Sequence, residues 1–310
     1  MAAQTTDSIL LVRPSNFGYN EETASNNSFQ KRESQLSRKE ISERAISEFD
    51  NMVQILRQAH LSVEALQDTF EPEKPDAVFP NNWVSFHENG AIITYPLFSA
   101  KRRPERREEI IDFIEVKYGF QRRYSFEQYE TKSLFLEGTG SMVLDRINRK
   151  VYSCFSPRTD PTILDKFCAL MDYNPVMFTA KDSQGIDIYH TNVMMAIGEG
   201  FVVLCLDSLV IPDDRVAVIK SLKETKKEII EISLDQMNAF AGNLLPVRNA
   251  MGESLIVLSE AAFQSLTNGQ QDSLSSHGKL IVIPIYSIEY FGGGSIRCMV
   301  AEIFKPIEMT

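Results

Sequence analysis

The sequence lacks the cysteine patterns that hold small secreted domains together or bind zinc. Its four cysteines, Cys154, Cys168, Cys205 and Cys298, are scattered, with neither a CxxC pair nor Cys/His ligand spacing. A disulfide scaffold and a zinc site are therefore both disfavoured. A chain of 310 residues with ordinary apolar content can bury a sizeable core without cross-links. We expect a protein of the reducing cytoplasm that carries no metal and needs no cofactor.

Long apolar runs and basic clusters are also scarce. The apolar run near the amino terminus, SILLV at 8–12, is too short for a signal-peptide core or a membrane span. The net charge is -10, and KRRPERR at 101–107 is the only dense basic run. This argues against nucleic acid, because phosphate neutralisation needs stripes of Lys and Arg. We interpret the basic run as a solvated helix face or a local substrate contact. The expected partner is a small amino-acid substrate, with no membrane and no nucleic acid, and no oligomeric state is indicated.

Equivalent strand–turn–strand patterns recur along the chain at an almost constant interval. The corresponding points are Asn82, Glu137, His190, Asn243 and Gly294. The steps between them are 55, 53, 53 and 51 residues, and such a regular step is typical of a repeat architecture. The hairpin turns that follow these points are expected at 88–90, 146–148, 198–200 and 251–253. Each unit therefore contributes two strands joined by a hairpin and then a helix.

Closing five such ββαβ units in a ring predicts one catalytic α/β domain over residues 1–310, a five-bladed propeller. The fifth unit must be completed by both chain ends. The start supplies SILLVRP at 8–14 and a helix over 37–60, and the end supplies YFGGGSIRCMVAEIF at 290–304. The first strand of each unit then lines a central channel, and the helices lie outside, which buries their apolar faces and leaves few free sheet edges.

Prolines and capping residues predict where the helices begin. Pro104, Pro161 and Pro212 fall in first turns, where the missing N–H costs nothing. Ser37 and Glu40 form an S-x-x-E capping box.

Two stretches have no clear periodicity. Residues 268–277 are interpreted as an irregular loop. Residues 15–35 are polar and too long for a plain connector, so we interpret them as either a functional lid or a disordered flap.

Equivalent positions in a ring of repeats face one axis, so polar residues from different units are brought together. The residues expected to converge are Asn81, Asn82, Glu137, His190, Asn192, Asn243 and Cys298. A thiol, an imidazole and a carboxylate supply a nucleophile, a general base and a group that orients the base. Each also has a structural alternative, since a buried cysteine is often only a small core residue. A non-catalytic, ring-shaped binding protein is therefore the alternative from another class.

Six short motifs carry a resemblance to a known family. They are PDAVFPNNW (75–83), LEGTGS (136–141), SPRTD (156–160), YHTN (189–192), FAGN (240–243) and GGGSIRCM (292–299). In this order and spacing the chain resembles the guanidine-modifying pentein superfamily of arginine deiminases, dimethylargininases and amidinotransferases, and most closely its citrulline-utilisation hydrolases. The resemblance covers essentially the whole chain and implies the same five-bladed α/β propeller.

The resemblance also implies roles for individual residues. Cys298 matches the family's nucleophile, His190 its general acid/base and Glu137 the acidic residue that supports the histidine. Arg158 matches an arginine that pairs with the α-carboxylate of the substrate, for which a planar guanidinium is well shaped. Asp76 matches an acidic residue that contacts substrate in the dimethylargininases. Asn81, Asn82, Asn192 and Asn243 are expected to complete the substrate pocket.

Two amides stand where many family members have aspartates that grip a cationic guanidinium, at Asn82 and Asn192. An amide offers both donors and an acceptor, so it complements a neutral ureido group. We therefore predict a hydrolase of a ureido amino acid such as citrulline, which passes through a covalent intermediate on Cys298. With a neutral substrate, His190 would have to activate the thiol as an imidazolium. An amidinotransferase, or an arginine or dimethylarginine hydrolase, is the enzymatic alternative.

Overall fold

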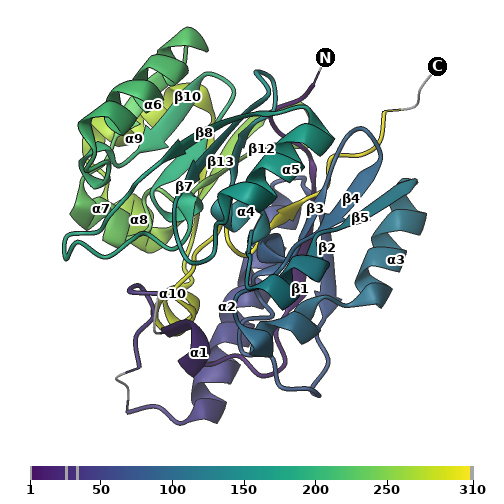
Figure 1. The fold of residues 1–310 in the computed structure, drawn as a ribbon. Coiled ribbons are helices and arrows are strands. Elements are labelled where there is room, and N and C mark those ends of the chain that lie inside the picture. The colour runs from purple at the N-terminus through teal and green to yellow at the C-terminus, as the bar shows by residue number, and fades with distance from the viewer. Residues whose placement is uncertain (1, 25–26, 33–34, 308–310) are drawn as a thin grey trace.

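The computed structural model describes residues 2–24, 27–32 and 35–307, and within these it contains five three-stranded sheets around a common centre (Figure 1). In each sheet a short inner strand pairs antiparallel with a middle strand, which pairs parallel with an outer strand. The inner strands are β3 (Val84–Phe86), β6 (Val143–Asp145), β9 (Met195–Ile197), β12 (Leu245–Arg248) and β15 (Ala301–Glu302). The middle strands are β4 (Ala91–Thr94), β7 (Lys150–Cys154), β10 (Phe201–Leu204), β13 (Ser254–Ser259) and β1 (Ser8–Arg13). The outer strands are β5 (Arg122–Ser125), β8 (Asn174–Phe178), β11 (Glu228–Glu231), β14 (Lys279–Ile283) and β2 (Ser62–Gln67).

The five-bladed α/β propeller predicted from the repeats is confirmed. As expected, both chain ends build the fifth blade, because β15 pairs with β1 antiparallel and β1 pairs with β2 parallel. The purple strand β1 and the yellow strand β15 lie side by side in Figure 1. The middle strands are almost wholly buried, which explains their continuous apolar sequence.

Helices connect the middle and outer strands and cover the outside of the ring, as Figure 1 shows for α3, α6 and α9. The longer ones are α2 (Arg38–Gln58), α3 (Glu108–Tyr118), α5 (Pro161–Met171), α6 (Pro212–Glu224) and α9 (Asn268–His277). The shorter helices of the described chain are α1 (Glu21–Ala24), α4 (Gly138–Ser141), α7 (Leu234–Asn238), α8 (Glu260–Ser265) and α10 (Tyr286–Gly292). Five 3₁₀ turns complete the described part of the chain: η1 (Pro80–Asn82), η2 (Ala100–Glu105), η3 (Glu127–Lys132), η4 (Thr191–Val193) and η5 (Leu206–Ser208).

Most of the predicted helix starts are confirmed, and one is wrong. Ser37 and Glu40 form the reciprocal capping box of α2, and Pro161 and Pro212 open α5 and α6. Pro104, however, lies inside η2, and α3 begins only at Glu108. In this turn Arg102 is buried instead of facing solvent.

The interpretation of 268–277 as an irregular loop is also wrong. This stretch is helix α9, and Thr267 caps it through a reciprocal bond with Gln270. Among the residues of α9 only Leu274 is fully buried, so the helix shows almost no apolar periodicity to recognise. In the part of the chain that the structure describes, no helix is both long and apolar enough to cross a membrane.

Candidate active site

The residues expected to converge all lie in the short turns that lead into the inner strands. Asn82 ends η1 before β3, α4 follows Glu137 and leads into β6, and η4 follows His190 and leads into β9. Asn243 and Cys298 occupy the corresponding turns before β12 and β15. Because the inner strands surround the channel, these five turns meet at one end of it. Cys298 lies in a turn that ends before β15 begins at Ala301.

The cysteine and histidine face one small cavity with a volume of about 20 Å³, which is room for about one water molecule. The residues that line it are Thr23, Asn27, Asp76, Phe79, Asn82, Arg102, Arg158, Tyr189, His190, Gly292, Gly293, Gly294 and Cys298. A sulfur near the carboxyl end and an imidazole from the middle of the chain are thereby brought to the same place. The cavity is too small for an amino acid, so substrate entry requires part of its wall to move.

His190 and Glu137 form the best-defined pair in the site. His190 Nε2 lies 2.8 Å from Glu137 Oε2, and Glu137 Oε1 accepts a hydrogen bond from the backbone N–H of Phe98 at 2.9 Å. Burial alone would raise the pKa of Glu137, but Arg158, the hydrogen bond to His190 and Arg102 together hold it below its usual value. The carboxylate is therefore ionised and holds the imidazole ring through Nε2. The other ring nitrogen, Nδ1, takes no part in this hydrogen bond.

Gly140 explains why the turn before β6 contains glycine. A Cβ atom at this position would lie 2.9 Å from the His190 ring and 2.5 Å from Asn82 Nδ2. Both distances are shorter than van der Waals contact, so any side chain at residue 140 would displace the imidazole or the amide. The glycines before Cys298 act similarly, since a Cβ on Gly294 would lie 2.9 Å from Phe79 and 3.2 Å from Cys298 Cβ.

Two asparagines hold the sulfur of Cys298. Asn243 Nδ2 lies 3.3 Å from Sγ, and the thiol faces Asn192 Oδ1 at 3.6 Å. Asn243 Oδ1 also accepts the backbone N–H of Arg297 at 3.0 Å, which fixes the turn. Burial raises the pKa of Cys298, and the hydrogen bonds from the Ser295 turn, Asn243 and Asn192 offset only part of this effect. The resting sulfur is therefore a protonated thiol.

The protonation of His190 bears on how the thiol is activated. Burial lowers the pKa of His190 to about 4, although Glu137 acts in the opposite direction. The imidazole is consequently neutral near pH 7 and is suited to accept the thiol proton as a general base. The expected activation by an imidazolium concerns the complex with a neutral substrate. In the free protein, burial of the ring disfavours its charged form.

The opposite wall of the cavity is charged. Arg158 lies 3.5 Å from Glu137 Oε2, donates to the backbone oxygen of Thr23 at 3.3 Å and stacks 4.8 Å above the ring of Tyr189. Asp76 Oδ2 accepts from Asn20 Nδ2 at 2.7 Å. Asp76 Oδ1 is buried without a hydrogen-bond partner in the described structure. An arginine and a carboxylate side by side can bind the two charges of an α-amino acid.

Arg102 is a site residue that the sequence interpretation missed. Its guanidinium donates to Asn82 Oδ1 at 2.8 Å and pairs with Glu105 at 2.8 Å, and it also lies 3.7 Å from Asp76. The solvated-face interpretation of the basic run is therefore wrong for Arg102, whereas the alternative of a local substrate contact is consistent with its place in the cavity wall. The sequence signal that could have indicated this is the i,i+3 spacing of Arg102 and Glu105 on either side of Pro104, which places the two charges together in one turn.

Not every predicted residue reaches the cavity. Asn81 is buried and accepts from Asn82 Nδ2 at 3.0 Å, but it does not line the cavity. Asn192 and Asn243 contact the sulfur of Cys298 from behind instead of lining the front of the site. Arg297, next to the cysteine, does not line this cavity and pairs with Glu302 at 2.7 Å. Among the described residues, no group of His, Cys, Asp and Glu side chains is arranged to hold a metal ion.

Part of the polar stretch 15–35 contacts the cavity. Thr23 and Asn27 line the cavity, Asn20 bonds to Asp76, and Asn27 Nδ2 donates to the backbone oxygen of Gly293 at 3.3 Å. Asn20, Thr23 and Asn27 therefore make the contacts expected of a lid over the cavity. Residues 25–26 and 33–34 of this stretch lie outside the described residues.

Comparison with known proteins is consistent with this geometry. The family model for N,N dimethylarginine dimethylhydrolase, eukaryotic, matches residues 13–305. ArgZ, an arginine dihydrolase from the ornithine-ammonia cycle in cyanobacteria, superposes with a TM-score of 0.74 at 16% identity, covering 97% of this chain and 41% of ArgZ. The isolated N-terminal domain of ArgZ bound to product gives a TM-score of 0.73 at 17% identity and covers 97% of this chain and 98% of that domain.

A third solved structure is a mutant of DDAH from Pseudomonas aeruginosa complexed with citrulline. Its TM-score is 0.65 at 13% identity, with 97% of this chain and 100% of that chain covered. At these identities the structures show a shared fold. The chain spans about 41% of full-length ArgZ, and no curated protein matches it.

Proposed function

Because the chain belongs to the N,N-dimethylarginine dimethylhydrolase family of the pentein superfamily, we propose that it is a cysteine-dependent hydrolase. Its reaction cleaves a carbon–nitrogen bond in the ureido or guanidino group of an α-amino acid. The observation that carries this proposal is that the Cys298 thiol faces the same small cavity as His190, whose ring is bonded to Glu137.

In the proposed mechanism His190 carries a proton in each half of the reaction: first from Cys298 to the leaving amine, and then from water back to the sulfur. His190 accepts this proton, and the thiolate attacks the central carbon of the substrate, so a sulfur–carbon bond forms. The carbon–nitrogen bond then breaks, and the leaving amine takes the proton from His190. His190 next removes a proton from water, whose oxygen attacks the thiocarbamoyl or thiouronium carbon, and the sulfur leaves and regains its proton. Glu137 stabilises the imidazolium that forms in each half of the reaction.

The charged wall selects an α-amino acid. Arg158 and Arg102 present guanidinium groups suited to the α-carboxylate, and the unpartnered Oδ1 of Asp76 suits the α-ammonium group. When the α-carboxylate and α-ammonium groups are bound in this way, the substrate's head group meets the amides of Asn192 and Asn243 beside the sulfur. Glu137 is not available to a cationic head group, because it is already paired with His190. This arrangement favours a neutral ureido head group, and thus a citrulline-like substrate, over a cationic guanidinium.

A guanidino substrate is the second candidate, and a specific observation supports it. Asp76 is completely buried, and burial raises its pKa, so a cationic ligand that restores its charge would be bound favourably. Asp76 would then pair with the guanidinium instead of the α-ammonium group. The family name and the arginine dihydrolase ArgZ agree with this alternative.

Product analysis tests the proposal and separates the two candidates. The purified protein is incubated separately with citrulline, arginine and dimethylarginine. Citrulline hydrolysis yields ornithine, ammonia and carbon dioxide, arginine hydrolysis releases ammonia, and dimethylarginine hydrolysis releases dimethylamine. Cys298→Ala should abolish turnover and the covalent adduct seen by intact-mass spectrometry, and Cys168→Ala on α5 should retain both. Undiminished turnover of Cys298→Ala would refute the proposal, and transfer to an added amine would identify an amidinotransferase instead.

A further inference from the structure

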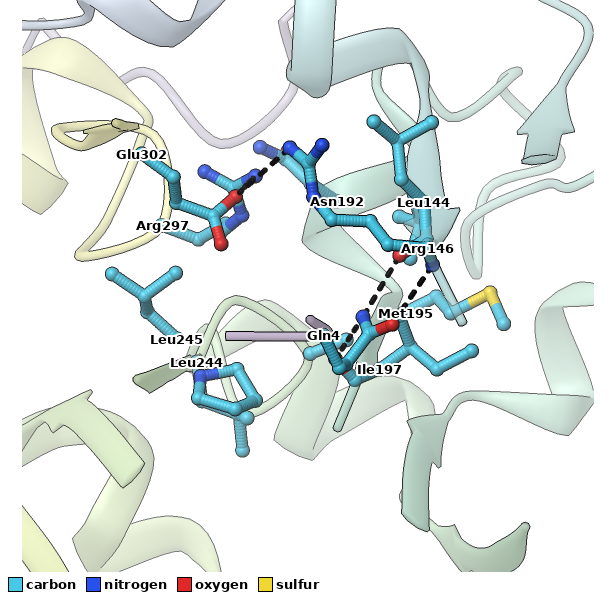
Figure 2. A pocket seen from close by; sticks show the side chains of 13 residues that line it. Gln4, Leu144, Arg146, Asn192, Met195, Ile197, Leu244, Leu245, Arg297 and Glu302 are labelled. Carbon is cyan, nitrogen blue, oxygen red and sulfur yellow. Dashed lines mark hydrogen bonds and ion pairs between the residues drawn. The ribbon is translucent and has the colours of Figure 1, made fainter. Parts of the chain in front are cut away.

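A second cavity lies in the central channel behind Cys298. It has a volume of about 30 Å³ and is bounded by strands β6, β9, β12 and β15 and by Gln4 near the amino terminus (Figure 2). This is space for about two water-sized groups. Asn192 separates it from the nucleophile, because Asn192 lines the cavity while its Oδ1 faces the Cys298 thiol.

The walls of this channel cavity carry more positive than negative charge. Its charged side chains are Arg146, Arg297 and Glu302, two cations against one anion. Glu302 Oε2 accepts from Arg297 at 2.7 Å and lies 4.0 Å from Arg146, and Figure 2 shows the guanidinium groups beside the carboxylate. The Arg146 guanidinium therefore has no carboxylate within hydrogen-bond distance among the described residues.

The neighbours of Arg146 do not supply the missing negative charge. The Arg146 guanidinium lies 3.7 Å over the ring of Phe304 and contacts His87 Nδ1 at 3.4 Å. Burial lowers the pKa of His87 well below its usual value, and the positive charges of Arg146 and Arg149 lower it further. This imidazole is therefore neutral. Among the side chains that line the cavity, the positive charges therefore exceed the negative charges by one.

The uncharged groups at the cavity also leave a donor free. Asn192 Nδ2 is buried without a hydrogen-bond partner in the described structure, and it lies on the side of the amide away from the thiol. The amide of Gln4 is already occupied, because Nε2 donates to Leu144 O at 2.9 Å and Oε1 accepts from the backbone N–H of Arg146 at 2.8 Å. A ligand in this cavity therefore meets N–H donors from several directions.

We propose that the channel cavity binds a small inorganic monoanion, held by Arg146, Arg297 and the amide of Asn192. A water molecule must donate two hydrogen bonds as well as accept them, whereas an anion accepts from every donor and neutralises the excess charge. The anion is either a halide from solvent or bicarbonate. Bicarbonate would form from the carbon dioxide that the reaction releases, so this second source rests on the proposed function. A negative charge one amide away from the thiol opposes thiolate formation, so the bound anion keeps Cys298 protonated.

Bromide is the probe for this site because its position is visible by anomalous scattering. Crystals of the protein grown without halide and soaked in sodium bromide should show an anomalous peak between Arg146, Arg297 and Asn192. In solution, sodium bromide should raise the Tm by about 3 °C over sodium gluconate at equal ionic strength and pH. Ordinary water density without an anomalous peak in the cavity would overturn the proposal.

Matched arginine variants assign the bromide effect to this cavity. Arg146→Gln should lose the bromide-specific rise in Tm, whereas Arg248→Gln, at an exposed position on β12 paired with Glu199, should retain it. A full rise in Arg146→Gln would refute the assignment. If Arg146→Gln does not fold, the bromide soak of the unmodified protein decides alone.

A bicarbonate titration distinguishes the two sources of the anion. If bicarbonate displaces bromide at a lower concentration than chloride does, the site serves the reaction product, and otherwise it serves a halide from solvent. The bromide experiments need no turnover, so they can succeed or fail independently of the proposed hydrolase activity.

Discussion

His190 Nε2 and Glu137 Oε2 lie 2.8 Å apart in the interior of the propeller, and neither side chain is more than 2% exposed. An exposed pair with the same geometry exists elsewhere in the chain, where His277 Nε2 lies 2.8 Å from Glu228 Oε2. The two pairs differ in burial and in their neighbours. Comparing the same substitution in each pair therefore distinguishes a catalytic role of the buried contact from a general structural role.

Glu137→Gln should reduce kcat by about 100-fold or more, because the amide cannot stabilise the imidazolium that forms during the reaction. Steady-state kinetics on the best substrate measures this loss, and circular dichroism verifies the fold. Glu228→Gln is the matched control and should retain full activity. Equal losses in the two variants would mean that the buried contact has no special role in turnover.

The pH dependence of kcat/KM should follow the neutral form of His190. Burial lowers the pKa of His190 to about 4, so the active neutral form persists well below pH 6.5 and is lost as the pH falls through about 4. A plateau from about pH 5 to neutrality is therefore expected, provided that the protein stays folded. In Glu137→Gln the acid limb should move to lower pH, because Glu137 raises the pKa of His190. An acid limb near pH 6.5 would show that the ring is solvated.

The repeat pattern was sufficient to predict the fold because each blade is specified locally. Apolar middle strands, hairpin turns and the caps at Ser37, Pro161 and Pro212 are signals that act within a few residues. The equivalence of the blades then placed the functional candidates at one end of the channel. Long-range contacts were not needed for either step.

The errors arose where distant contacts decide the structure. Arg102 is held by Asp76 and Asn82, which are remote in sequence, so a basic run that looked like a solvated surface contributes to the interior. The state of His190 could not be predicted either, because its pKa depends on how completely surrounding segments exclude water. Helix α9 was missed because it buries little apolar surface.

Gly140→Ala should impair catalysis without removing any functional group. The added methyl group would lie 2.9 Å from the His190 ring and 2.5 Å from Asn82 Nδ2, so the imidazole must shift. We expect kcat/KM to fall by about 100-fold and the stability to fall by about 1–3 kcal/mol. The control is Gly269→Ala on α9, where nothing lies within 4 Å of the new Cβ, and which should leave both quantities nearly unchanged. Full activity of Gly140→Ala would show that the ring position is not critical.

Asn20→Ala should weaken the lid and raise KM. Asn20 Nδ2 donates to Asp76 Oδ2 at 2.7 Å and ties the segment over the cavity to the wall that binds the amino-acid end of the substrate. A hydrogen bond to a charged group contributes about 1.5 kcal/mol, which corresponds to roughly a ten-fold increase in KM. The value of kcat should change less than about two-fold, since the contacts of Cys298 and His190 remain. Asn16→Ala is the matched control, because Asn16 lies in the same segment but bonds to the backbone oxygen of Phe70 at the surface. Steady-state kinetics of the two variants should therefore differ in KM alone, and a fall in kcat without a change in KM would assign Asn20 to the chemical step instead of to lid closure.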